Sequence, residues 1–157
     1  MNDFSMWHDA PFAILTAHIR QRYHDTHRVQ LDDLLVLAQK VNSVHAGVFP
    51  ADILPLLKNI QAELLSHMMK EEQILFPMLD QGMGRGAAMP IRMMMHEHTE
   101  HEAAITHLLE LTHQLTPPID ACGSWQRLYA EAQIFVNDLN EHMTLENEVL
   151  FARALAS

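Results

Sequence analysis

The chain has 157 residues, of which 48% are apolar, so it is long enough to bury the core of one domain. Twenty acidic residues against ten basic ones give a net charge of -10, which argues against nucleic acid and anionic membranes as partners. The single cysteine excludes a disulfide framework and a cysteine-rich metal site. Because no targeting segment and no membrane-length apolar run is visible, we expect a soluble, cytoplasmic protein.

Four long segments with helical periodicity follow one another, separated by short breaks. They cover about residues 11–45, 52–80, 89–115 and 124–154, and apolar residues recur in them near every 3.6 positions. Short connections between long helices make sequential helices antiparallel neighbours. The sequence therefore predicts an all-α fold, an up-down-up-down four-helix bundle that forms a single domain over residues 1–157.

The first predicted helix carries two candidate histidine ligands on its inward stripe. His24 shares this stripe with Leu31 and Leu35, and His27 lies one turn further along the same broad stripe. From the stripe alone the two histidines are rivals. His45 lies 21 residues from His24, about 30 Å along a straight helix, so we interpret it as a helix-end or second-site residue.

The second predicted helix places a carboxylate on an apolar face. His67 and Glu71 lie four residues apart, which is roughly 40° around the axis and one turn along it. We expect Ile60, Ile74 and Met78 to share their inward face. A carboxylate buried on a core stripe is unfavourable unless it is paired or binds a metal ion.

The third predicted helix contributes one further inward imidazole. His98 shares its stripe with Ile91, Ile105 and Leu109. Several other histidines are expected at the surface or beside the ligands, namely His18, His96, His101, His107 and His113.

An internal repeat links the second and fourth helices. Residues 67–76 and 142–151 carry His, Met, Glu, Leu and Phe at the same offsets, so His142 and Glu146 repeat the arrangement of the second helix. An antiparallel bundle places these two helices diagonally across the core, pointing the same way. The two copies should therefore face each other.

One acidic residue precedes the histidine of each copy by one helical turn on the inward side. Glu63 stands before His67, and Asp138 stands before His142. Each is either a hydrogen-bond partner of the ligands and a polar path to solvent, or one of a solvated pair at the bundle edge.

Depth along the helices brings the candidate ligands into one layer. Counted in residues along each helix from the connecting breaks, six residues lie at a similar level of the bundle, namely His24, His67, Glu71, His98, His142 and Glu146. Mixed imidazole and carboxylate ligands suit iron, manganese or zinc and disfavour calcium or magnesium. Two carboxylates from opposite helices can bridge two ions, with two imidazoles on each. We therefore predict a non-haem di-iron centre with two iron ions, an oxo or hydroxo bridge and a position for a small ligand.

These residues resemble the hemerythrin-like family, whose pattern is one histidine on the first and third helices and His-x-x-x-Glu on the second and fourth. The segments 66–78 and 145–151, with Tyr23-His24-Asp25, resemble the RIC (repair of iron centres) branch more closely, and the likeness extends from about Trp7 to Ala156. The match favours His24 over His27 as the ligand. The resemblance implies a di-iron centre that helps to mend iron–sulfur clusters damaged by nitric oxide or oxidants.

The chain departs from the family pattern in two places. Oxygen-carrying hemerythrins have His-x-x-x-His in the third helix, and here the first position is Met94, which predicts one imidazole fewer and disfavours oxygen carriage. RIC proteins also carry a small N-terminal domain with a vicinal cysteine pair, which we expect this chain to lack because Cys122 is its one cysteine.

Three functions are compatible with this interpretation. The first is repair of damaged iron–sulfur proteins, and the second is sensing or scavenging of O2 or NO. The third is a peroxidase or NO reductase activity, which we consider the weakest because no electron-transfer motif or substrate pocket is visible. Damaged iron–sulfur proteins, O2 and NO are the expected partners, and a homodimer is left open.

Overall fold

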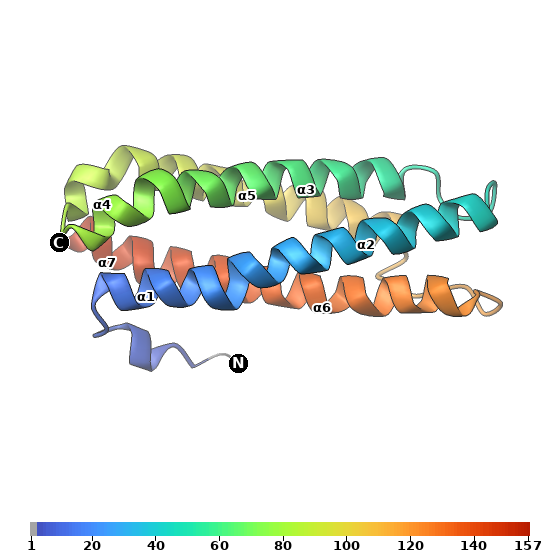
Figure 1. Ribbon diagram of the computed structural model, residues 1–157, viewed down its shortest axis with the longest axis horizontal. Coiled ribbons are helices and arrows are strands. Elements are labelled where there is room, and N and C mark those ends of the chain that lie inside the picture. Colours follow the sequence, from blue (N-terminus) through green and yellow to red (C-terminus); the bar gives the residue numbers. More distant parts are fainter. Residues whose placement is uncertain (1–2) are drawn as a thin grey trace.

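The computed structural model describes residues 3–157, and within this range it contains helices and no strand. Four long helical rods lie side by side (Figure 1), which confirms the predicted all-α four-helix bundle. The elements are η1 (Ser5–Trp7); α1 (Phe12–Ile19), η2 (Arg20–His24) and α2 (Asp25–Val44) in the first rod; α3 (Ile53–Lys70), η3 (Glu71–Leu75) and α4 (Phe76–Asp80) in the second; η4 (Gly84–Ala87) and α5 (Ala88–Leu111) in the third; and α6 (Gly123–Leu145), η5 (Glu146–Phe151) and α7 (Ala152–Ala156) in the fourth.

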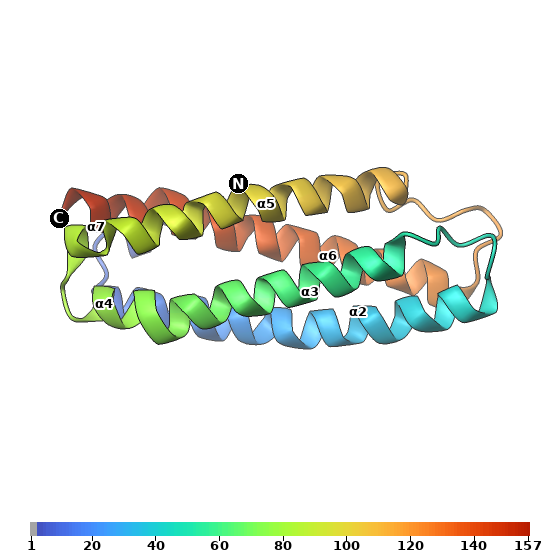
Figure 2. The same ribbon diagram turned by 90° about the horizontal axis from the view of Figure 1, so that it is seen from above.

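The rods are antiparallel and sequentially connected. The α2–α3 and α5–α6 connections lie at one end of the molecule, and α4 and the C-terminus lie at the other (Figures 1 and 2). Helix α2 packs against both α3 and α6, and α3 also packs against α5. The second and fourth rods, which carry the internal repeat, therefore lie diagonally across the bundle. Among the described residues, no helix is long and apolar enough to cross a membrane.

Three rods contain a π-helical turn, which the sequence periodicity did not predict. The turn η3 shifts the register of the second rod by about one residue, because a π turn holds more residues than an α turn. Ile74, expected inside, is therefore 55% exposed, and Met78 is only half-buried. Leu75, Phe76 and Leu79 are buried in their place. The predicted inward stripe of this helix is thus wrong beyond Glu71.

The third helix ends at Leu111, whereas the sequence suggested about residue 115. The backbone enters the left-handed region at His113, Gln114 and Leu115, with φ between 50° and 59°. The hydroxyl of Thr112 donates to the Leu108 carbonyl and accepts from the Leu115 N–H, so it satisfies backbone groups that the helix leaves free. The apolar character of Leu115 reflects burial in the connection rather than continuation of the helix.

The core has two apolar clusters, one toward each end of the bundle. The larger one joins α2, α3, α5 and α6, and the smaller one joins α1, α4, α7 and the first turns of α5. A layer of buried polar side chains separates them along every rod. Because buried polar groups are unfavourable without partners, this layer needs an explanation other than packing.

Candidate metal centre

All six predicted ligands meet in this polar layer. They form two groups, and within each group the potential ligand atoms lie within 4.8 Å of one another. We call the group around His24 and His142 the enclosed half, and the group around His67 and His98 the pocket-side half. Both halves include the same two carboxylates. The members are His24, Glu71, His142 and Glu146 in the enclosed half, and His67, Glu71, His98 and Glu146 in the pocket-side half.

The π-helical turns position three of these side chains. His24 is the last residue of η2, whereas Glu71 and Glu146 are the first residues of η3 and η5. Such turns are rare and are frequently found at functional sites. The four-residue spacing within each repeat holds before the π turn begins, so the sequence predicted the ligands without predicting the turns.

Each carboxylate faces one imidazole of each half. The distances from imidazole Nε2 to the nearest carboxylate oxygen are 3.1 Å for His24–Glu71, 3.5 Å for His67–Glu71, 2.9 Å for His98–Glu146 and 3.2 Å for His142–Glu146. This arrangement is what two carboxylates shared between two ions require.

Several inward atoms of the layer are buried and, although they lie close to one another, no hydrogen bond satisfies them among the described residues. They are the Nε2 atoms of His67, His98 and His142, Oε2 of Glu71 and both carboxylate oxygens of Glu146. Unpaired buried polar atoms cost about 1–3 kcal/mol each, and more when they are charged. Cation ligation by these nitrogens and oxygens removes that cost, so the residues fit a metal centre.

The electrostatics of the two carboxyl groups lead to the same conclusion. Burial, followed by the negative charge of Glu146, raises the pKa of Glu71 well above its ordinary value. Burial also disfavours the ionised form of Glu146. His142 and His98 stabilise that form more strongly, and they hold the pKa of Glu146 well below its ordinary value. Two carboxylates in one buried layer favour a cation between them, and the raised pKa of Glu71 means that protons compete with a cation for this carboxylate.

Each candidate imidazole is held from behind through Nδ1. The partners and distances are Glu72 at 2.6 Å for His24, Glu97 at 2.9 Å for His67, Asn147 at 2.8 Å for His98 and the Nε2 of His27 at 3.0 Å for His142. An occupied Nδ1 fixes the ring orientation and leaves Nε2 to face the centre, as in known metal-binding histidines.

His27, the rival ligand of the first helix, belongs to neither group. Its Nε2 contacts His142, and its Nδ1 lies 3.0 Å from Gln30 Oε1. Gln30 Nε2 then donates to Asp138, which also accepts from Arg22. Burial and the proximity of His142 lower the pKa of His27 to about 3, so the ring is neutral and can accept the Nδ1–H of His142. Asp138 is thus linked to His142 through Gln30 and His27, which is one of the two roles that the sequence left open for it.

Three other residues singled out by the sequence lie outside the two groups. His45 caps α2, and its ring is 5.5 Å from that of Trp125, far along the bundle. His101 is only 8% exposed, and its ring is 4.9 Å from that of His67, so it is not a surface residue. Glu63 is exposed on α3 and lines a pocket that reaches His101.

Sequence reasoning assigned no role to an aromatic group behind the enclosed half. Tyr23 stacks on His142 with ring centroids 5.1 Å apart, and its hydroxyl donates to Glu141. Burial, followed by Glu141, raises the pKa of Tyr23, so the phenol stays protonated. His18 stacks on Trp7 and meets the edge of Tyr23. The signal in the sequence was only that Tyr23 precedes a ligand.

Comparison with known proteins agrees with this geometry. The sequence model of one protein family, the hemerythrin HHE cation-binding domain, matches residues 16–154. The chain belongs to this family. Family membership and the two buried groups identify the cofactor as a pair of iron ions, as the sequence predicted.

Several similar proteins are named iron-sulfur cluster repair proteins. The chain is 59% identical over 157 residues to the iron-sulfur cluster repair protein DnrN of Neisseria gonorrhoeae, and the match covers all of both chains. It is 46% identical over 156 residues to the iron-sulfur cluster repair protein YtfE of Pectobacterium carotovorum subsp. carotovorum, covering 98% of this chain and 71% of that one. It is also 47% identical over 151 residues to YtfE of Musicola paradisiaca, covering 95% and 68%.

Proposed function

We propose that the six buried His and Glu residues hold two iron ions and that the protein uses this iron to repair damaged iron–sulfur clusters. The observation that carries the proposal is the pair of buried groups that share both carboxylates. The second part is supported by one relative that matches over its whole length and by a longer one that is covered to 71%, both named iron-sulfur cluster repair proteins. Damage by nitric oxide or oxidants is the condition under which we expect the protein to act.

Each ligand has a distinct task in this proposal. His24 and His142 would bind one ion, His67 and His98 would bind the other, and the carboxylates would bridge the two. Bound iron supplies Lewis acidity and one-electron redox chemistry. The carboxylates that accept from Nδ1 of His24 and His67 orient both rings so that Nε2 faces the ions.

The ligand count leaves room for small ligands and for release of iron. Two imidazoles and two shared carboxylates provide four protein ligands per ion, fewer than an octahedral ion accepts. Met94, which stands where an oxygen carrier has a further imidazole, is buried. We therefore propose NO and O2 as ligands of the centre and damaged iron–sulfur proteins as partners. The cytoplasm, where a free thiol such as that of Cys122 stays reduced, is the proposed compartment.

Cluster repair can be tested directly. Iron-loaded protein is mixed with a [4Fe–4S] protein whose cluster has been degraded by NO, and recovery of the cluster absorbance is followed with reductant and sulfide supplied. We expect recovery with the natural protein and with His45→Ala, which lies outside the layer, and no recovery with the double variant Glu71→Leu/Glu146→Leu. Reversible NO binding with no iron transfer would instead establish the alternative, a sensor or scavenger. Turnover of NO or peroxide with a reductant would establish an enzyme.

A further inference from the structure

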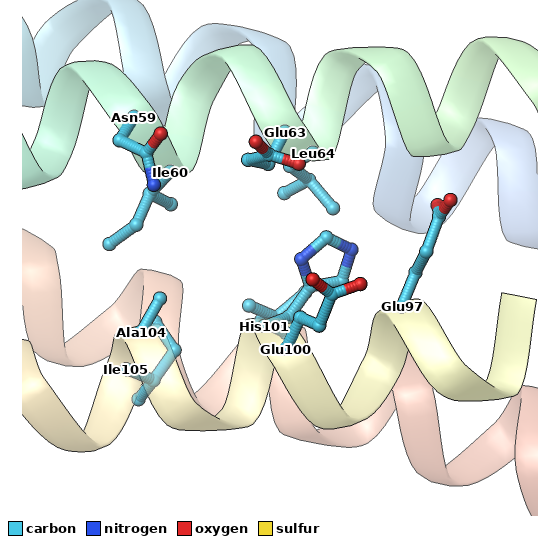
Figure 3. A pocket seen from close by; sticks show the side chains of 10 residues that line it. Asn59, Ile60, Glu63, Leu64, Glu97, Glu100, His101, Ala104 and Ile105 are labelled. Carbon is cyan, nitrogen blue, oxygen red and sulfur yellow. The ribbon is translucent and has the colours of Figure 1, made fainter.

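An acidic pocket opens beside the pocket-side half of the centre. It lies between α3 and α5 and has a volume of about 180 Å³. Figure 3 shows Glu63 on one helix and Glu97 and Glu100 on the other, with His101 between them. The rest of the lining is apolar apart from Asn59, and it includes Leu139 of α6. A net negative charge and an apolar wall concentrate cations from solvent.

His101 is the unusual member of this pocket. The residue is 92% buried, and its Nε2 has no hydrogen-bond partner among the described residues. Its imidazole points into the space between the helices, across from Glu63 and Leu64 (Figure 3). Buried imidazoles normally have both polar positions satisfied, so an unpaired nitrogen aimed into an acidic pocket indicates a ligand.

The position of His101 connects solvent to the centre. Its ring centroid is 4.9 Å from that of His67 and 6.3 Å from that of His98. Glu97, also on the pocket wall, accepts from Lys70 and contacts Nδ1 of His67. That carboxylate is therefore committed to an ion pair. Glu63 and Glu100 are the other acidic residues on the pocket wall; Glu100 lies 3.8 Å from His96, and this pair is weak because both side chains are exposed.

We propose that His101, with Glu63 and Glu100, forms a third cation site through which Fe²⁺ enters and leaves the pocket-side half. One imidazole with carboxylate oxygens is a donor set that suits ferrous iron, manganese, cobalt and zinc. Partial ligation with water in the remaining positions makes such a site weak, which a transit site requires. The transit role rests on the proposed iron centre, whereas the cation site stands on the pocket itself.

Counting bound cations tests the site. Protein loaded with two iron ions is oxidised to hold them firmly, titrated with Co²⁺ and examined by native mass spectrometry and by the visible absorption of Co²⁺. The matched variants are His101→Gln and His107→Gln, since His107 is exposed on the same helix. We expect one Co²⁺ beyond the two iron ions in the natural protein and in His107→Gln. We expect at least tenfold weaker Co²⁺ binding in His101→Gln with both iron ions retained.

Iron release tests the route. A ferrous chelator should extract iron from the reduced pocket-side half several-fold more slowly in His101→Gln and in Glu63→Gln than in the natural protein. Because Glu63 is exposed, its replacement separates loss of the route from a packing defect. Equal Co²⁺ binding by both histidine variants, or equal release rates in all proteins, would overturn the inference. Fewer than two iron ions in the natural protein would instead refute the proposed centre.

Discussion

The two halves of the centre offer the same donors but differ in what surrounds them. One imidazole of each half lies against a phenylalanine ring, with Phe76 stacked on His24 at 5.6 Å and Phe151 on His98 at 5.8 Å. The second imidazole differs: in the enclosed half, Tyr23 stacks on His142 at 5.1 Å. In the pocket-side half, His67 meets the edge of His101 and, behind it, the acidic pocket. Identical ligands therefore do not imply equivalent ions, because access to solvent differs.

Outer hydrogen bonds do not explain a difference between the halves. Each half has one imidazole backed by a carboxylate, Glu72 behind His24 and Glu97 behind His67, and each of these carboxylates also accepts from a basic side chain. The other imidazole of each half has a neutral partner. Since the outer partners are balanced in this way, we predict unequal iron lability from the difference in access alone.

The largest effect is expected at the residues that both halves share. Glu71→Leu or Glu146→Leu should remove the coupled di-iron absorption and most of the bound iron, because each carboxylate contacts imidazoles of both halves. His45→Leu, at the end of α2, should leave two iron ions bound. Metal analysis with optical spectra measures both. Equal iron loss in the His45→Leu protein would show that the bound ions lie elsewhere.

Replacing one imidazole should separate the halves. His67→Ala should leave iron mainly in the enclosed half, and His24→Ala should leave it mainly in the pocket-side half. We expect the iron retained by His67→Ala to be extracted by a chelator about tenfold more slowly than that retained by His24→Ala, because Tyr23 covers His142 whereas the other half adjoins the acidic pocket. Stopped-flow chelation measures the two rates. The comparison fails if the iron kept by His24→Ala is the slower to leave.

An added imidazole should make the pocket-side half less labile. Met94 lies one turn before His98 and is buried, so Met94→His places a further donor near that half. We expect slower chelator release and slower reaction with NO at that ion. The alternative is that Met94 only packs, in which case a misfitted polar group costs about 1–3 kcal/mol of stability. Faster iron release from the folded variant would favour packing alone.

The smallest change in the number of bound ions is expected behind the enclosed half, where only an outer partner is replaced. His27→Phe removes the acceptor of the His142 Nδ1–H while keeping a ring of similar shape. Loss of such an outer partner typically weakens metal binding about 10–100-fold. Competition with a chelator of known affinity measures the change, and Gln30→Ala should shift it in the same direction by less. Unchanged affinity in both variants would mean that His142 needs no support from this chain of hydrogen bonds.

The sequence predicted the six candidate ligands because donors at four-residue spacing lie on one helical face and because a repeat placed two such pairs across the bundle. It did not predict the π turns, since these shift the register by only one residue and depend on packing between helices. Ile74 was therefore placed on the wrong face. His101 was predicted at the surface or beside the ligands, and the polar run around it did not decide between the two. The structure places it beside His67.

The outer partners had a signal in the sequence that periodicity alone does not use. Three of them are direct neighbours of a ligand on another helix: Glu72 follows Glu71, Glu97 precedes His98, and Asn147 follows Glu146. A polar residue beside an inward ligand points along the interface toward the next helix. Such neighbours were therefore candidates, although only the packed bundle shows which imidazole each one reaches.

The most direct test of unequal access is to count iron during its extraction from the natural protein. Reduced, fully loaded protein is exposed to an excess of ferrous chelator, and native mass spectrometry follows the two-iron, one-iron and metal-free species over time. Unequal halves predict that the one-iron species accumulates to a majority before it decays, and that His101→Gln delays its formation. A direct passage from two-iron to metal-free protein, with no accumulation of the one-iron species, would contradict the account.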